Sequence, residues 1–168
     1  MIKTVSMKTK FFSFKTITAT FLTAATIAIA SMSSNAQTPA TQQGVYTITG
    51  NASGTQVVPS VTGNGAGSIT GTYDPSTHVL DYTTNWSNLT GAPASAGFYS
   101  GASGVAGKPL GDPWAFGTNV TPTGNITGKM TLTDDQAKQL TDGNWYYSMS
   151  TPTNATGEIR GQITAKKK

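Results

Sequence analysis

The amino-acid sequence predicts an all-β fold, an antiparallel Greek-key β-sandwich with one short helix near residues 134–140. Three observations lead to this prediction. Short segments alternate between polar and apolar residues, which is the period of a strand with one buried face. The 19 Gly and 8 Pro residues separate these segments as turn signals. Only one segment carries the start signal of a helix.

The first half of the predicted domain contains three strands, at residues 45–49, 68–73 and 78–86. In the first strand Tyr46 and Ile48 share one face, with Thr on the other. The Asp-Pro pair at 74–75 favours a type I turn, so the second and third strands are expected to form a hairpin. Residues 56–58 stand beside Pro59 and a Gly-rich run, and are expected to form a short edge segment.

The second half begins with a long segment, residues 87–122, in which Gly and Pro recur every few residues. This segment is expected to be mostly loop, with one short strand. Thr133 and Gln136 form a capping-box pattern that predicts the helix, and Gly143 is expected to end it. The strands predicted in this half lie at residues 96–100, 123–132, 144–150 and 158–164.

About seven short strands at this spacing are typical of immunoglobulin-like and superoxide-dismutase-like sandwiches. Large aliphatic residues are few, so aromatic side chains are expected to fill much of the core. Each buried side chain contributes roughly 1.5–3 kcal/mol of transfer free energy. The predicted core consists of Tyr73, Leu80, Tyr82, Trp86, Ile126, Met130, Leu132, Leu140, Tyr147, Ile159 and Ile163.

The amino terminus has the layout of a secretory signal. A basic start is followed by an apolar stretch of about fourteen residues, too short for the roughly twenty that a membrane span needs. Small residues at Ser34 and Ala36 suit a signal peptidase. We expect residues 1–36 to be a cleaved signal peptide, residues 37–43 a polar leader, residues 44–164 the domain and residues 165–168 a solvated basic tail. The mature protein is then secreted or periplasmic, without a membrane span.

Composition excludes several kinds of site. The sequence has no Cys and one His, so disulfides, zinc–thiolate sites and cysteine nucleophiles are impossible. The formal net charge of +4 equals the four lysines that precede residue 16, all within the predicted signal. Without a basic patch in the rest of the chain, nucleic-acid binding is not expected.

Several motifs together resemble a known extracellular family. They are Gly54-Thr-Gln-Val-Val-Pro59, Leu132-Thr-Asp-Asp-Gln136 before the helix, and the ending Gly157-Glu-Ile-Arg-Gly-Gln-Ile163. The sequence from about residue 44 to 164 is similar to the CHRD domain, the module repeated in chordin and found singly in many secreted bacterial proteins. The resemblance implies a compact antiparallel β-sandwich with a role in binding or at the cell surface, and no established enzymatic activity.

The chain departs from that family at the histidines. Members usually have an Ala-His-Ile-His segment in the middle and a His-Thr pair after the Tyr-containing strand, a trio that invites a metal-site hypothesis. The corresponding positions here are Gly97, Tyr99 and Ser150. We therefore expect no zinc or copper site of the ordinary nitrogen and sulfur type, no metal and no cofactor.

Three sets of side chains remain as candidates. Glu158 and Arg160 lie two apart on a strand and point to one face, where they pair or hold a neighbouring loop, or where Arg160 clamps an anion. His78 has no second His to complete a metal site. The tentative ligand-binding set is the aromatic group Phe98, Tyr99, Trp114 and Phe116, which lies in the loop-rich middle. Such rings stack on sugars or on an apolar partner, or form a hydrophobic cluster under the loop.

No catalytic set is recognisable, so the sequence predicts a secreted, non-enzymatic binding or adhesion module that contacts a protein or glycan at the cell surface. Two alternatives stay open. One is a metal-dependent redox enzyme on a superoxide-dismutase-like sandwich, and the other is a purely structural envelope protein.

Overall fold

The computed structural model of the protein describes residues 44–168. The predicted signal peptide at 1–36 and the polar leader at 37–43 lie outside the described residues. Nine strands, one α-helix and one 3-10 helix make up the described part. They are β1 (Tyr46–Ser53), η1 (Gly54–Gln56), β2 (Ala66–Asp74), β3 (Val79–Ser87), β4 (Ser95–Ser100), β5 (Pro109–Leu110), β6 (Gly124–Thr131), α1 (Asp134–Thr141), β7 (Trp145–Ser150), β8 (Ile159–Gln162) and β9 (Thr164–Lys167).

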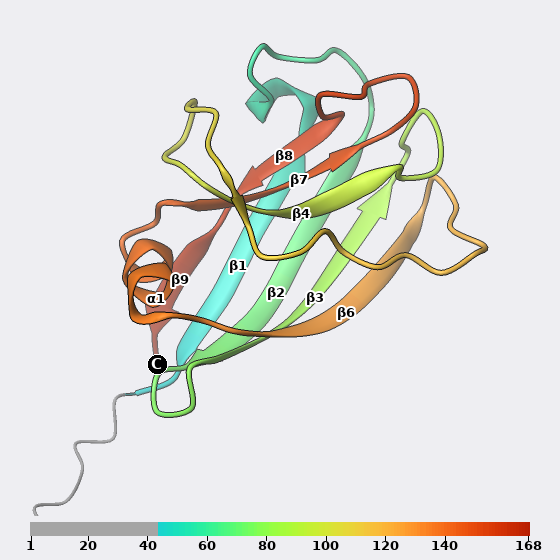
Figure 1. Cartoon of the computed structure of the whole chain (residues 1–168). Coiled ribbons are helices and arrows are strands. Elements are labelled where there is room, and N and C mark those ends of the chain that lie inside the picture. Colours follow the sequence, from blue (N-terminus) through green and yellow to red (C-terminus); the bar gives the residue numbers. More distant parts are fainter. Residues whose placement is uncertain (1–43) are drawn as a thin grey trace, which may run out of the picture. The chain divides into compact units, whose positions relative to one another are not determined.

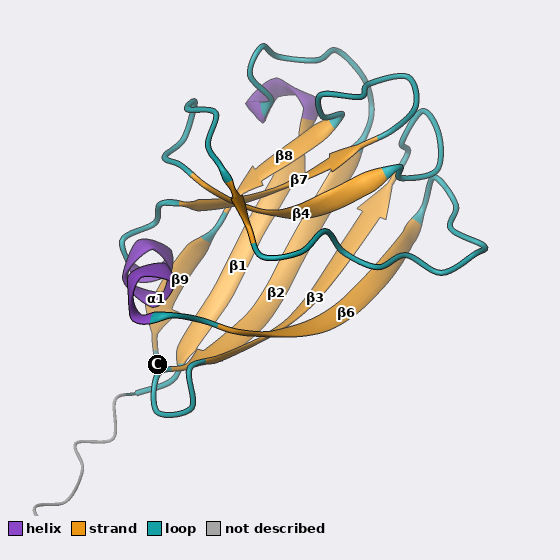
Figure 2. Ribbon diagram, viewed as in Figure 1, coloured by secondary structure: helices purple, strands orange, loops and turns teal. Residues whose placement is uncertain are grey.

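The strands form one antiparallel sheet that curls into two facing layers. The order along the sheet is β5-β4-β7-β8-β1-β2-β3-β6, and β9 also pairs with β1. Figure 1 shows β4, β7 and β8 in one layer, in front of the layer that contains β1, β2, β3 and β6. Figure 2 shows the same view with α1 beside β9, at one end of the strands. The predicted all-β antiparallel sandwich is confirmed.

The two layers are joined by a strand that turns a corner at Ile163. Before the corner, β8 pairs with β7 and meets β1 only at Ser53 and Arg160. After it, β9 pairs with the first half of β1, from Tyr46 to Thr49. Residues 165–168 therefore do not form a separate tail, because the backbone of residues 165–167 continues the ladder, while the side chains of Lys166, Lys167 and Lys168 are exposed. The backbone N–H of Lys168 also donates to the carbonyl of Val45, at 3.0 Å.

Two further segments differ from the prediction. Residues 54–56 form the 3-10 helix η1, so the short edge segment expected at 56–58 is not a strand. The two-residue strand β5 in the middle loops was not predicted, and it pairs with β4. Glycines and prolines surround β5, so local pattern gave no alternation from which to find it.

The core is built largely from aromatic rings that lie over glycines. A Cβ at Gly161 would stand 2.6 Å from Cε1 of Tyr147, and a Cβ at Gly128 would stand 2.6 Å from Cζ of Tyr82. Each ring therefore lies over its own ladder partner, because the neighbouring strand has no side chain there. Every residue of the predicted core is buried or packed against the buried cluster, Tyr82, Ile126 and Met130 being the partly buried ones.

Residues 111–123 lie between the free edges of the two layers. The backbone N–H of Trp114 donates to the carbonyl of Ala96 in β4, at 2.8 Å. On the other side, Nε1 of Trp86 in β3 donates to the carbonyl of Thr121, at 3.0 Å. This segment therefore bridges β4 and β3, and it brings a tryptophan into the gap between the layers.

The helix α1 begins and ends as predicted. Its capping box is complete, because Thr133 Oγ1 accepts from the N–H of Gln136 and Gln136 Oε1 accepts from the N–H of Thr133. Gly143 follows the helix with a φ of +77°, a conformation that glycine adopts at little cost. Leu140 is the fully buried side chain of the helix, which fixes α1 to the core.

Candidate functional site

The structure separates the four aromatic residues of the predicted ligand-binding set. Phe98 and Trp114 are 3% and 7% exposed and belong to the core cluster. Phe116 is half-buried, with its ring edge-on to Trp86 at 5.6 Å between centroids. These three rings form the cluster under the middle loop and do not form an exposed stacking surface. Only Tyr99 lies outside the core.

Tyr99 lies on the outer face of β4, where it stacks on Tyr146 of β7. Their ring centroids are 5.2 Å apart and their planes differ by 11°. The two residues are direct partners in the β4–β7 ladder, so the strand register sets this stack. Burial raises the pKa of Tyr99 above its usual value, and the neighbouring Tyr146 raises it further.

The three positions that correspond to family histidines share this outer face. Gly97 and Tyr99 are two apart on β4, and Ser150 on β7 pairs with Ser95. The Ser150 hydroxyl donates to the carbonyl of Ser95, at 3.4 Å. The fold thus places the three positions on one face of two neighbouring strands, but Tyr99 lies four residues along β4 from Ser95, the partner of Ser150, and Gly97 has no side chain.

Glu158 is a buried carboxylate held by two threonines. It is 3% exposed and accepts from the N–H of Thr90 at 2.7 Å, the hydroxyl of Thr90 at 2.6 Å and the hydroxyl of Thr151 at 2.6 Å. Burial acts to raise the pKa of Glu158, but these hydrogen bonds outweigh it and lower the pKa overall. Glu158 therefore ties the loop after β3 to the turn between β7 and β8.

Arg160 is also buried, at 4% exposed, and it has no ion-pair partner among residues 44–168. Its Nη2 donates to the carbonyl of Ala102 at 2.8 Å and lies 3.5 Å from Oε1 of Gln162. Its Cζ stands 3.6 Å from the centre of the Tyr146 ring. Burial lowers the pKa of Arg160, and Tyr146 acts in the opposite direction.

Every residue of the ending Glu158–Ile163 has a structural role. Ile159 and Ile163 are in the core, and Gly161 leaves room for the Tyr147 ring. Gln162 donates through Nε2 to the carbonyls of Gly101 and Gly143, at 2.9 and 2.8 Å. The side chains of Arg160 and Gln162 therefore hold two loops, the one after β4 and the one after α1. The interpretation in which Glu158 and Arg160 pair with each other does not hold.

A small cavity lies beside Arg160 on this face, and we call it the Arg160 cavity. Its volume is about 100 Å³. Tyr99, Tyr146 and Ser148 line it from β4 and β7, and Val57 and Val58 line it from the segment after η1. The cavity thus combines one cationic group with aromatic, hydroxyl and apolar neighbours. That combination is typical of small binding sites.

His78 lies at the other end of the domain, in the turn between β2 and β3. Its φ is +58°, and its Nδ1 is 3.5 Å from Oδ1 of Asp134, the first residue of α1. Both side chains are substantially exposed. Within residues 44–168, no group of three or more His, Cys, Asp or Glu side chains is arranged to hold a metal ion.

The outer face of the other layer carries a regular array of short polar side chains, which we call the hydroxyl face. One row crosses five strands in register and consists only of threonines: Thr164, Thr49, Thr70, Thr83 and Thr127. A second row contains Lys166, Thr47, Thr72, Asp81 and Lys129. A third contains Asn51, Ser68, Asn85 and Asn125.

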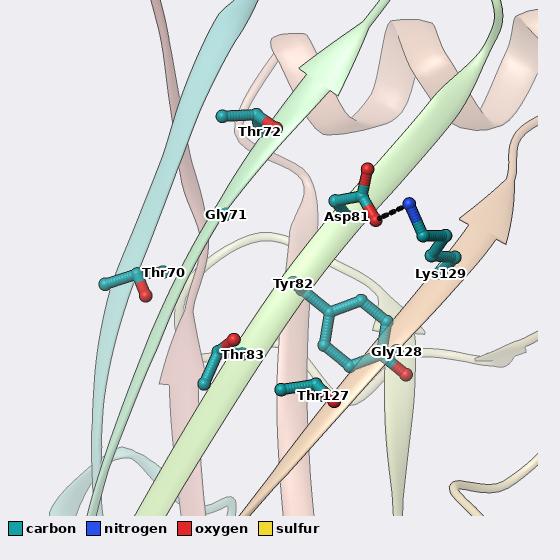
Figure 3. Close-up of a pocket in the computed structure, with 9 residues that line it drawn as sticks. All are labelled: Thr70, Gly71, Thr72, Asp81, Tyr82, Thr83, Thr127, Gly128 and Lys129. Carbon is teal, nitrogen blue, oxygen red and sulfur yellow. Dashed lines mark ion pairs between the residues drawn. The ribbon is translucent and has the colours of Figure 1, made fainter.

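The hydroxyl face is hollowed at β2, β3 and β6. The hollow has a volume of about 430 Å³, and Figure 3 shows Thr70, Thr83 and Thr127 along it. Asp81 and Lys129 form an ion pair of 2.7 Å at its end, drawn as a dashed line. The threonine row itself carries no charge, so the middle of this surface offers only hydroxyl groups and backbone.

Sequence reasoning missed the hydroxyl face. The signal was present, because Thr, Ser and Asn recur at alternate positions of residues 47–51, 68–72 and 81–85. Alternation shows which residues share a face of one strand, but it does not give the register between strands. The row of five threonines depends on that register.

In the described residues, 44–168, no helix combines the length and the apolar character needed to cross a bilayer.

Comparison with known proteins gives one result on family. No significant match to the chain was found among curated proteins or among solved structures. The model of the CHRD domain matches residues 48–163, from β1 to the corner after β8. This range includes the closing segment, Glu158–Ile163, the Arg160 cavity and most of the hydroxyl face. The chain belongs to the CHRD domain family.

Proposed function

We propose that the protein is an exported, non-enzymatic binding module that attaches to neutral polysaccharide at the cell surface through its hydroxyl face. The observation that carries this proposal is the row of five threonines across five strands. Export is supported by the signal-like layout of residues 1–36.

The chemistry of the face favours a neutral, hydroxyl-rich ligand. Hydroxyl and amide side chains both donate and accept hydrogen bonds, so they match the hydroxyl groups of sugars in either direction. An anionic ligand would need fixed positive charges, and the threonine row has none. Lys129, the cation nearest the hollow, is already paired with Asp81.

The geometry of the face favours a polymer. Neighbouring strands are about 4.8 Å apart, so five threonines in a row extend over roughly 19 Å. That length exceeds a single sugar and suits several linked units. Adjacent strands also rotate by roughly 20° relative to each other, so the row follows a twisted surface. A flexible chain can follow this twist, whereas a flat crystalline lattice cannot.

Affinity electrophoresis in gels that contain a neutral polysaccharide tests the proposal. We expect dextran or a soluble β-glucan to retard the protein, with little dependence on NaCl concentration. Thr70→Lys together with Thr127→Lys should weaken the retardation at least about tenfold, because two charged side chains then displace the sugar from the hollow. Both positions are exposed, so the fold should persist.

Thr118→Lys is the matched control, because Thr118 is exposed but lies in the segment between the layers. It should bind as the parent does. Absence of retardation by all neutral polysaccharides would contradict the proposal, as would equal retardation of the double variant. Retardation by alginate alone, abolished by salt, would also contradict it.

The non-enzymatic part of the proposal rests on the thin supply of reactive side chains. The chain has no Cys, and its one His lies at an exposed turn beside Asp134. Elemental analysis of the purified protein separates this proposal from a metal-dependent redox enzyme. We expect far less than one copper or zinc per chain, and a stoichiometric metal that survives dialysis would contradict the proposal.

A further inference from the structure

Arg160 is a buried cation without a counter-charge. The only carboxylate nearby in the sequence, Glu158, is already engaged by three donors from Thr90 and Thr151. Removing a charge from water costs several kcal/mol unless a partner compensates for it. The carbonyl of Ala102 and the Tyr146 ring supply part of that compensation.

Part of the guanidinium remains available for a ligand. The hydrogen bonds of Arg160 both come from Nη2, so Nε and Nη1 have no bonded partner among the described residues. Arg160 also lines the Arg160 cavity. The Tyr146 ring covers one face of the guanidinium and leaves its edge free. Nη1 carries two N–H donors that can reach the oxygens of an anion in the cavity.

The size and walls of the cavity restrict that anion. A volume of about 100 Å³ has room for a carboxylate with a short aliphatic chain and excludes larger anions. Val58, at 46% exposed, stands at the rim with Val57 and offers an apolar contact. The hydroxyl of Ser148 already donates to the carbonyl of Ile159, at 3.0 Å, and so can accept but not donate to the ligand.

We infer that the Arg160 cavity is a carboxylate-binding site, in which Nη1 of Arg160 donates to the carboxylate and Val57 and Val58 contact the attached aliphatic group. The ligand is an aliphatic carboxylate, either a small organic acid or the free carboxyl end of a peptide. This site lies on the opposite layer from the hydroxyl face and does not depend on polysaccharide binding.

Titration of the ¹⁵N-labelled protein with sodium butyrate, at constant ionic strength, tests this inference by NMR. We expect saturable shifts for Tyr99, Ser148 and Arg160, with a dissociation constant on the order of millimolar. A dipeptide that ends in Val, with a free or an amidated carboxyl group, separates the two sources. If the dipeptide with a free carboxyl group binds more tightly than butyrate, the ligand is a peptide end. If that dipeptide binds more weakly than butyrate, the ligand is a small organic acid.

Two variants make the test specific. Arg160→Lys keeps the positive charge but removes Nη1, and should weaken butyrate binding about tenfold. Because Arg160 also holds Ala102, a second variant leaves that contact intact. Val58→Asp places a negative charge at the rim and should weaken binding at least tenfold. Val105→Asp is the control, since Val105 is 54% exposed and does not line the cavity. It should change binding less than about twofold.

Three results would overturn the inference. They are shifts that rise linearly with butyrate and never saturate, equal binding of the amidated dipeptide, and equal weakening by Val58→Asp and Val105→Asp. Loss of polysaccharide binding with intact butyrate binding would instead concern only the proposed function, because the two sites lie on different layers.

Discussion

Glu158, just before β8, and Arg160, within it, are charged side chains that are buried in different ways. Glu158 accepts three hydrogen bonds from Thr90 and Thr151. Arg160 instead donates to the carbonyl of Ala102 and packs against the ring of Tyr146. A buried carboxylate with all its oxygens bonded stabilises the fold, because breaking any of those bonds leaves a charge poorly compensated. Glu158 therefore belongs to the framework, and Arg160 belongs to both the framework and the candidate site.

Glu158→Gln tests the role of the carboxylate. We expect the free energy of unfolding at pH 7 to fall by about 2–3 kcal/mol, since the amide loses the charge to which three donors are directed. Urea denaturation followed by tryptophan fluorescence measures this change. Asp112→Asn, at an exposed position in the middle loops, is the control and should change stability by less than about 0.5 kcal/mol.

The difference in unfolding free energy between the parent and Glu158→Gln should depend on pH. The pKa of Glu158 is lower in the folded protein than its unfolded value, which is about 4.3. Its contribution is therefore fully present above pH 4.3 and is lost as the pH falls through the folded pKa. The stability difference between the parent and Glu158→Gln should shrink on acidification. A constant difference from pH 7 to pH 2 would show that the carboxylate charge plays no part.

Neighbouring strands of this domain fit together because several aromatic residues have a glycine as their partner in the ladder. Trp86 lies over Gly124 and Tyr82 lies over Gly128, both between β3 and β6, while Tyr147 lies over Gly161 between β7 and β8. The glycines are not turn residues at these positions. They allow a layer of rings to replace the aliphatic core that the composition lacks.

Gly161→Ala tests one of these pairs, that of Gly161 with Tyr147. The new Cβ would stand 2.6 Å from the Tyr147 ring and 2.8 Å from the carbonyl oxygen of Asn51, which belongs to backbone. We expect a loss of about 1–3 kcal/mol in the free energy of unfolding. Gly63→Ala is the matched control, because nothing lies within 4 Å of its Cβ. Thermal melts of equal midpoint for both variants would contradict the proposed fit.

The local sequence pattern predicted most helices and strands. It failed for features that depend on which strands pair with each other. The capping box of Thr133 and Gln136 was readable because it depends on four consecutive residues. The alternation of strands gave the buried faces, including those of Tyr73 and Leu80. The alternation could not predict β9, because two lysines at 166 and 167 are typical of a solvated chain end. Only the pairing with β1 shows that these residues form a strand. The alternation could not bring Arg160 against Tyr146, which requires the register of β7 and β8.

Residues 111–123 join the two layers of the sheet at their free edges. Trp114 stacks on Tyr82 of one layer at 5.4 Å and on Tyr147 of the other at 6.2 Å, between ring centroids. A loop side chain thus joins two layers whose terminal strands, β5 and β6, do not pair with each other. The position of Trp114 in a loop suggested a ligand contact from the sequence, and its burial shows a structural one.

Trp114→Ala tests this closure. We expect a loss of about 3–5 kcal/mol in the free energy of unfolding, because the removed ring leaves a cavity between the layers. Phe116→Ala should cost clearly less, since Phe116 is only half-buried. Urea denaturation followed by far-UV circular dichroism measures both. Equal losses in the two variants would show that Trp114 has no special role between the layers.

Strand β1 has late neighbours in the chain: Ser53 faces Arg160, and Tyr46 faces Lys167. A polypeptide still being synthesised, or threaded through a translocation channel, has its first strand without those partners until residues 159–167 become available. Pairings over such long sequence separations form slowly, because loop-closure entropy opposes them. All the neighbours of β1 are therefore present only when nearly the whole domain is available, an order that would suit the export proposed above.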